Sequence, residues 1–247
     1  MGTDRFGVLL GNSRLRYGRF EGLLVSDRGA LDWEAFVAED AGGLLELLGD
    51  GQSEVVVGSV RDDRLEGLGR RLDGFTLLVA GRDFEIPIEN HYENPGEAGT
   101  DRLLNVLAAR VRWPGEAVIV VDFGTALSIS VVSEAGEFLG GPIGVGERTA
   151  LRGLEISTPQ LPGVGDGSEL PLIARGTEQA IRAGVRCQVR SGVLGLIEGV
   201  RSELGSRARV VATGGEAGLV AVGSELFDSI EPDLTLEGLA AAAAAGL

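Results

Sequence analysis

The segment Tyr92–Arg102 combines side chains that can bind a polar substrate with one that can accept a proton. It reads YENPGEAGTDR and leads into apolar residues at helical spacing from Leu103 onward. Asp101 is therefore expected at the start of a helix, where the helix dipole favours an ionised carboxylate. Two interpretations stay open. Either Thr100 or Asp101 caps the helix, or Asp101 lies at the mouth of a cleft and orients or deprotonates an attacking hydroxyl.

Two strand–turn–strand repeats, 8–17 and 120–130, each place small polar residues directly after a glycine. The chain has no lysine, so backbone N–H groups, hydroxyls, arginine and metal would have to bind any phosphate. Only the second repeat carries an acid before its turn, because Asp122 aligns with Leu9 of the first repeat. A third turn, Thr213-Gly214-Gly215, follows another apolar strand and is either a ligand contact or simply a turn.

The alternation of apolar runs predicts an α/β protein that positions these turns. Strands are expected at 7–10, 15–25, 54–60, 76–80, 117–122, 127–133, 209–212 and 226–230. Helices are expected at 33–48, 64–72, 101–113, 177–204 and from residue 236. Because each repeat opens one half of the chain, we predict two duplicated lobes, 1–115 and 116–247, that face a nucleotide cleft.

Composition and charge narrow the class of protein further. The chain has 247 residues, 44% of them hydrophobic, and a net charge of −15, which opposes binding to nucleic acid or anionic membranes. No apolar run reaches the roughly 18 residues that cross a bilayer, and the first residues lack a basic region ahead of an apolar stretch. We therefore expect a cytoplasmic protein of one large or two small domains.

Taken together, the motifs resemble the type III pantothenate kinases, which belong to the superfamily of acetate kinase, sugar kinases and actin. The resemblance covers most of the chain, in the order GNSRLRYG, YENPGEAGTDR, VVDFGTALS, EFLGGPIGVG, GTEQAIRAGV, VATGG and EPDLTLEGL. It implies two ribonuclease H-like lobes with an ATP cleft between them. It also implies a phosphotransferase that converts pantothenate to 4'-phosphopantothenate, the first step of coenzyme A biosynthesis.

The resemblance assigns roles to individual residues. Asp101 is the implied proton acceptor, and the implied substrate-binding residues are Tyr92, Gly99, Thr100, Asp101, Arg102 and Thr177. Contacts to ATP, which is expected with Mg²⁺, are implied for Gly11, Asn12, Ser13, Arg16, Gly124, Thr125, Thr213, Gly214 and Gly215. Asp122 is the implied ligand of a monovalent cation, K⁺ or NH₄⁺, near a subunit interface.

The same resemblance predicts a homodimer. Four glycines of the expected long helix would let another backbone approach closely: Gly184, Gly192, Gly195 and Gly199. From the residues alone, that neighbour could equally be the chain's own sheet.

The first turn departs from the family pattern, which normally begins Asp-x-Gly-Asn-Thr. Here Leu9 takes the place of the aspartate, while Ser13 keeps the hydroxyl. The lost carboxylate is the one expected to hold hydrated magnesium near the transferred phosphate, and charge stabilisation carries most of phosphoryl transfer. Three functions therefore stay open: an active pantothenate kinase, a catalytically impaired homologue that binds ligand or regulates, and a kinase for a different small substrate.

Overall fold

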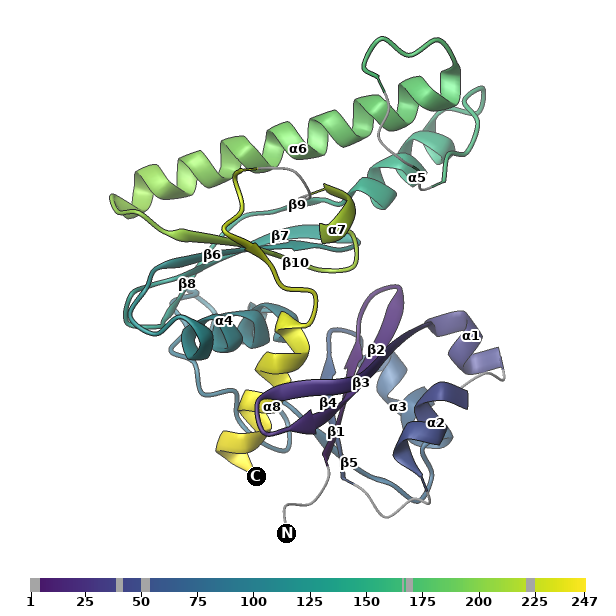
Figure 1. Ribbon diagram of the computed structural model, residues 1–247. Coiled ribbons are helices and arrows are strands. Elements are labelled where there is room, and N and C mark those ends of the chain that lie inside the picture. Colours follow the sequence, from purple (N-terminus) through teal and green to yellow (C-terminus); the bar gives the residue numbers. More distant parts are fainter. Residues whose placement is uncertain (1–4, 39–41, 50–53, 166, 168–170, 221–224) are drawn as a thin grey trace. The chain divides into compact units, whose positions relative to one another are not determined.

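The computed structural model describes residues 5–38, 42–49, 54–165, 167, 171–220 and 225–247 (Figure 1). The chain forms two compact units. The first unit consists of Met1–Gly115, Val132–Leu139 and Asp233–Leu247, and the second of Glu116–Val131 and Gly140–Pro232. One border of these units falls between Gly115 and Glu116. The last helix, however, groups with the first unit because its apolar residues pack there.

The first unit is built on a five-stranded sheet of order β3-β2-β1-β4-β5. Its strands are β1 (Arg5–Leu10), β2 (Arg14–Glu21), β3 (Leu24–Asp32), β4 (Glu54–Ser59) and β5 (Thr76–Val79). Strands β1, β2 and β3 form an antiparallel meander, and β4 and β5 run parallel to β1. The helices of this unit are α1 (Trp33–Ala38), α2 (Gly42–Leu48), α3 (Asp62–Arg71), α4 (Thr100–Arg112) and α8 (Leu234–Gly246), with a 3₁₀ turn, η1 (Pro95–Glu97).

Alternation along β1 sends neighbouring side chains to opposite faces of this sheet. Val8 and Leu10 belong to an apolar cluster with residues of α1, α2 and α3. Leu9 belongs to a different cluster, which includes residues of α4 and α8. The sheet is therefore covered by helices on both faces, and Leu9 points to the α4–α8 face.

The second sheet repeats the topology of the first. Its strands are β6 (Val118–Phe123), β7 (Ala126–Val132), β8 (Phe138–Gly140), β10 (Arg209–Thr213) and β11 (Ser229–Ile230), in the order β11-β10-β6-β7-β8, and β9 (Ile143–Val145) pairs with β7. Reading from β8 gives the first sheet's order, with β6 in the place of β1 and β10 in the place of β4. The predicted duplication into ribonuclease H-like folds is therefore confirmed.

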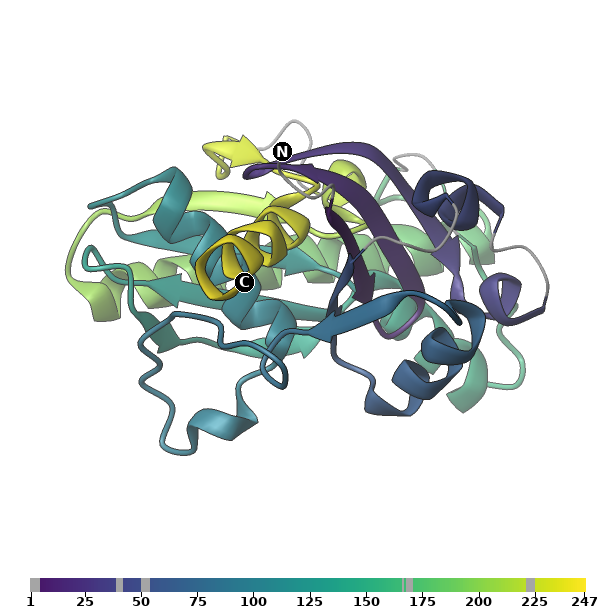
Figure 2. The ribbon, with the colours of Figure 1, turned by 90° about the horizontal axis from the view of Figure 1, so that it is seen from below.

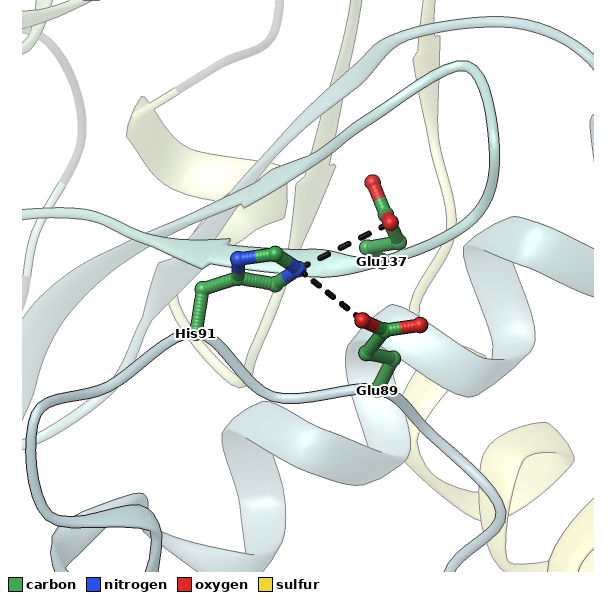
Figure 3. A group of neighbouring side chains, drawn as sticks. All are labelled: Glu89, His91 and Glu137. Carbon is green, nitrogen blue, oxygen red and sulfur yellow. Dashed lines mark ion pairs between the residues drawn. The ribbon is translucent and has the colours of Figure 1, made fainter.

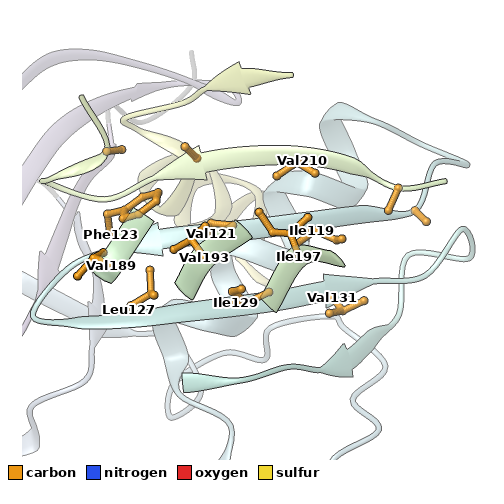
Figure 4. Packing of buried hydrophobic residues seen from close by; sticks show 14 of the residues in the cluster. Ile119, Val121, Phe123, Leu127, Ile129, Val131, Val189, Val193, Ile197 and Val210 are labelled. Carbon is orange, nitrogen blue, oxygen red and sulfur yellow. The ribbon is translucent and has the colours of Figure 1, made fainter. Parts of the chain in front are cut away.

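The long helix α6 (Thr177–Leu204) covers one face of this second sheet. Val189, Val193 and Ile197 pack from α6 onto apolar residues of β6, β7 and β10 (Figure 4). Two further helices of this unit are α5 (Glu147–Ser157) and α7 (Ala217–Val220). A buried ion pair joins α5 to α6, since Arg186 Nη2 lies 2.6 Å from Glu147 Oε1 and both side chains are largely inaccessible to solvent.

The structure corrects several predicted elements. The helix expected at 33–48 is two helices, α1 and α2, with residues 39–41 outside the described part of the chain. The strand expected at 15–25 ends at Glu21, because Gly22 adopts a φ of 67° and turns the chain into β3. Of the strand expected at 226–230, only Ser229–Ile230 forms. In the described ranges, no helix is both long and apolar enough to cross a membrane.

Helices α4 and α8 lie side by side in both views (Figures 1 and 2) and approach very closely. A Cβ added to Gly238 of α8 would lie 2.0 Å from the carbonyl oxygen of Leu104 in α4. Beside this contact, the buried Thr235 hydroxyl donates to Asn105 Oδ1 at 2.8 Å. Arg112 and Glu237 form an ion pair at 3.0 Å. The absence of a side chain at Gly238 therefore sets the separation of the two helices.

We predict that Gly238→Ala destabilises the first unit by about 1–3 kcal/mol, because the added methyl group must push α8 away from the α4 backbone. Urea unfolding followed by circular dichroism measures this. Gly153→Ala in α5 is the matched control, since its added Cβ meets nothing within 4 Å; it should stabilise by up to about 1 kcal/mol. Equal effects of the two substitutions would contradict this role of Gly238.

Candidate active site

Asp101 lies in the first turn of α4, beside a glycine that makes room for it. The N-cap residue is Gly99, which has no side chain that could cap the helix. Asp101 Oδ1 accepts a hydrogen bond of 2.8 Å from the backbone N–H of Arg102. A Cβ at residue 99 would lie 2.6 Å from this same Oδ1. Glycine at residue 99 thus allows the carboxylate to fold back over the start of the helix.

The surroundings of Asp101 favour its neutral form. Burial raises the pKa of the Asp101 carboxyl above its ordinary value, and the Arg102 N–H and the charge of Arg102 only partly oppose this. A carboxylate with a raised pKa is a stronger base than an ordinary aspartate, which suits a group that takes a proton in a reaction.

Arg102, the residue after Asp101 in α4, lies beside a stacked pair of aromatic rings. Its guanidinium carbon lies 5.6 Å from the centre of the Tyr92 ring and 5.0 Å from that of Phe138. The two rings stack at 5.2 Å, and Arg102 Nη1 donates to the Tyr92 hydroxyl. Burial lowers the pKa of Arg102, although a guanidinium stays charged at neutral pH. Arg102 is therefore a fixed cation beside Asp101.

Phe138 was not predicted as a site residue. It is fully buried in the short strand β8 and stacks on the Tyr92 ring. In the sequence, Phe138 is only the phenylalanine of EFLGG, and it lies far from Tyr92 along the chain, so no local pattern marks it as a site residue.

The turn between β1 and β2 carries the polar residues of the first repeat. The Gly11 N–H donates to the Arg14 carbonyl at 3.0 Å, and Asn12 and Ser13 are exposed. Arg64 of α3, which was not predicted as a site residue, donates to the Gly11 carbonyl at 2.9 Å. Burial lowers the pKa of Arg64. Arg64 therefore adds a positive charge at the base of this turn.

Leu9 is enclosed by aliphatic side chains. It is 8% exposed, and a Cβ added to Gly58 would lie 2.7 Å from Leu9 Cδ2 and 3.0 Å from Leu104 Cδ1. Arg16 lies opposite Leu9 on β2, and its Nη2 pairs with Asp233 Oδ1 at 3.2 Å. The position that carries the acid in the family pattern is thus apolar here, and the adjacent arginine pairs with a different carboxylate.

In the second unit, the turn after β6 brings together the predicted residues of the second and third glycine motifs. Asp122 pairs in register with Thr213 of β10. A Cβ at Gly214, whose φ is 94°, would lie 2.4 Å from Asp122 Oδ1. The Thr149 hydroxyl and the Gly146 N–H both donate to the Thr125 carbonyl, at 2.6 Å and 3.3 Å. This arrangement leaves the Thr125 side chain exposed.

The structure groups the predicted site residues by unit. Tyr92, Gly99, Thr100, Asp101 and Arg102 adjoin one another in the first unit, which also holds the turn of Gly11, Asn12, Ser13 and Arg16. The second unit holds Asp122, Gly124, Thr125, Thr213, Gly214 and Gly215, with Thr177 as the first residue of α6.

Two ribonuclease H-like units, each with a glycine turn after its first strand, define the fold class of the actin-like ATPases and sugar kinases. Three solved structures share this fold. One is the Baf family transcriptional activator of Campylobacter jejuni, with a TM-score of 0.59 and 20% identity over 95% of this chain and 94% of that chain. The second is (R)-2-hydroxyglutaryl-CoA dehydratase component A of Acidaminococcus fermentans, with a TM-score of 0.56 and 14% identity over 99% of this chain and 98% of that chain. The third is a ROK family glucokinase of Streptomyces griseus, with a TM-score of 0.52 and 15% identity over 98% of this chain and 99% of that chain.

The chain belongs to the type III pantothenate kinase family, because the model of that family matches residues 8–202. A type III pantothenate kinase of Dehalococcoides mccartyi strain CBDB1 is 42% identical over 164 residues, which are 66% of this chain and 62% of that relative. One of Acidiphilium cryptum is 36% identical over 211 residues, which are 84% of this chain and 77% of that relative. The matched part thus spans less than two thirds of the length of the Dehalococcoides relative.

We predict that Asp101 makes the folded state less stable as pH rises. Because the folded-state pKa is raised, its stabilising contribution is fully present below the unfolded pKa and is lost as pH rises through the folded pKa. The free energy of unfolding, measured in urea across acidic to neutral pH, should therefore fall in this window relative to that of Asp101→Asn. If the two free energies of unfolding differ by the same amount at every pH, this would contradict the raised pKa of Asp101.

Proposed function

We propose that the chain transfers phosphate from ATP to pantothenate, giving 4'-phosphopantothenate in the first step of coenzyme A biosynthesis. The observation that carries this proposal is the half-buried Asp101 with its raised pKa, adjacent to the Tyr92–Arg102 pair. Membership of the type III pantothenate kinase family supports the choice of reaction. The metabolic role would place the protein in the cytoplasm.

In this proposal, Asp101 accepts the proton of the hydroxyl that attacks the transferred phosphate. Gly99 keeps room for the carboxylate, and the raised pKa makes Asp101 a better base than an exposed aspartate. Arg102 is a fixed cation that complements the carboxylate of pantothenate, and Tyr92 orients it. Thr100 supplies a hydroxyl to the same substrate. Thr177, at the start of α6 in the second unit, is a further substrate-binding residue that the family resemblance implies.

The glycine turns would bind ATP. The exposed turn of Gly11, Asn12 and Ser13 offers amides and a hydroxyl to phosphate oxygens, and Arg16 adds positive charge. In the second unit, Gly124 and Thr125 would act in the same way, and Thr213, Gly214 and Gly215 would lie near the nucleoside. ATP brings Mg²⁺, which neutralises the developing charge on the phosphates. Leu9 provides no ligand for Mg²⁺, so we assign no protein residue to that ion.

A monovalent cation, K⁺ or NH₄⁺, fits the residues around Asp122. The Thr213 hydroxyl is fully buried and has no hydrogen-bond partner in the described part of the chain. It lies on the strand position paired with Asp122, so both oxygens lie on the same face of the sheet. Hydroxyl and carboxylate oxygens are ligands that such cations accept, and the bound ion would neutralise this carboxylate.

A homodimer is part of the proposal. Gly184, Gly192, Gly195 and Gly199 are all exposed on α6, and an added Cβ at each would meet nothing within 4 Å. They therefore do not pack against the chain's own sheet, which α6 contacts through Val189, Val193 and Ile197. The open face of α6 supports the close approach of a second subunit.

A second candidate is a catalytically impaired homologue that binds ligand or regulates. The burial of Leu9 among aliphatic side chains favours it, because no carboxylate takes the position of the phosphate-site aspartate. This candidate predicts that pantothenate and ATP stabilise the protein thermally without turnover.

We predict ATP-dependent phosphorylation of pantothenate in a coupled assay with Mg²⁺ and K⁺. Asp101→Asn should lower kcat by about 100- to 10,000-fold, because it removes the proton acceptor. Asp73→Asn, which removes an exposed acid of the same unit, should leave kcat unchanged. If pantothenate and ATP stabilise the unaltered protein thermally but no product forms, the impaired homologue is favoured. If the unaltered protein shows neither product formation nor ligand-induced stabilisation, pantothenate is rejected as the ligand.

We predict that Leu9→Asp lowers the free energy of unfolding by about 2–5 kcal/mol, because it removes a buried aliphatic side chain and buries a charge. Leu9→Asn is the matched control, because asparagine has nearly the size of aspartate but carries no charge. If the unaltered chain is an active kinase, neither substitution should raise kcat. A large rise in kcat with Leu9→Asp alone would instead identify the missing acid as the cause of an impaired activity.

A further inference from the structure

Three side chains outside the site described above converge on one point of the first unit. His91 Nε2 lies 3.6 Å from Glu89 Oε1 and 3.6 Å from Glu137 Oε1 (Figure 3). One ligand atom from each residue lies within 4.8 Å of the other two. We propose that Glu89, His91 and Glu137 bind a divalent transition-metal ion of the zinc type.

Backbone hydrogen bonds hold the three residues in register. The Phe138 N–H donates to the Glu89 carbonyl at 2.8 Å, and the His91 N–H donates to the Phe138 carbonyl at 3.0 Å. Asn90 and Phe138 thus form a β-bridge, with Glu89 and His91 on either side of Asn90. Residues two apart in an extended chain point to the same side, so both side chains face Glu137. The convergence therefore follows from the fold of the backbone.

Glu137 is also oriented by a second hydrogen bond. The Ser133 hydroxyl donates to Glu137 Oε2 at 2.7 Å, and the Glu137 N–H donates to the same hydroxyl at 3.1 Å. This leaves Oε1 directed toward His91. Partners that orient a ligating carboxylate in this way are a common property of metal sites.

The chemistry of the donors selects the ion. Metal–ligand bonds of about 2.1 Å place tetrahedral neighbours about 3.4 Å apart, close to the 3.6 Å that separates His91 Nε2 from each carboxylate oxygen. An imidazole with two carboxylates suits Zn²⁺, whereas Mg²⁺ and Ca²⁺ prefer oxygen ligands alone. Within the described ranges, no arginine pairs with Glu89 or Glu137, so a cation would neutralise them. The side chain of His91 is 45% exposed, which leaves room for water as a further ligand.

Metal binding would act on the neighbouring Tyr92. The ion would tie the segment of Glu89 and His91 to Glu137, the residue before Phe138, and Phe138 stacks on the Tyr92 ring. An effect on substrate binding rests on the proposed function, whereas the metal site itself does not.

The test uses the full chain without a polyhistidine tag. Zn²⁺ titrated by calorimetry should bind one ion per chain, and Co²⁺ should give the visible absorption of a tetrahedral site. Since His91 is the only histidine, its imidazole NMR signals report this site alone, and they should shift with Zn²⁺. Binding should be lost in His91→Ala and Glu137→Gln, and Ser133→Ala should weaken it by about tenfold.

Glu85→Gln is the matched control, because it removes one exposed carboxylate of the same segment outside the cluster. It should keep the affinity of the unaltered protein. Unchanged circular dichroism of each variant without metal shows that it has folded. Absence of saturable Zn²⁺ binding to the unaltered protein, or equal binding by His91→Ala, would overturn the proposal. Because no step needs ATP or pantothenate, this outcome is independent of kinase activity.

Discussion

The contact between Gly238 and the backbone of Leu104 determines where the candidate catalytic residues of the first unit lie. Any side chain at residue 238 would overlap the Leu104 carbonyl, so α4 and α8 can approach this closely only with glycine there. The Thr235–Asn105 hydrogen bond then sets their relative rotation. Because Asp101 and Arg102 lie in the first turn of α4, their positions against Tyr92 and Phe138 follow from this helix pair. A residue more than a hundred positions away in sequence thus positions the proposed proton acceptor, Asp101.

The two sheets have the same strand order but different chemistry at equivalent positions. Leu9 and Asp122 are each the second-last residue of the first strand in their sheets. Asp122 lies beside a glycine turn and a buried hydroxyl, whereas Leu9 belongs to the apolar cluster that includes residues of α4 and α8. The first position has thus become part of the hydrophobic core. The charged groups near the first turn are instead positive. Arg16 pairs with Asp233, and Arg64 donates to the Gly11 carbonyl.

Local patterns were enough to predict the duplication, both glycine turns and the start of α4, because each depends on residues close in sequence. Phe138 and Arg64 could not be found in this way, since only the folded chain brings them to Tyr92 and Gly11. The edge strand β3 was missed because its mostly exposed residues lack a clear alternation of polar and apolar types. The assignment of α8 to the first unit also depends on long-range packing, which its alanine-rich sequence does not reveal.

The return of α8 to the first unit has a consequence for how the chain folds. Arg5 of β1 donates to the carbonyl of Ala243, a separation of 238 residues. During synthesis, residues 116–232 emerge before this helix, so the second unit can fold while the first still exposes the apolar face that Leu9 shares with Leu104. Contacts of such long range slow folding, because a large loop must close before they form. A nascent chain of this protein would therefore expose this apolar face to chaperones until α8 has left the ribosome.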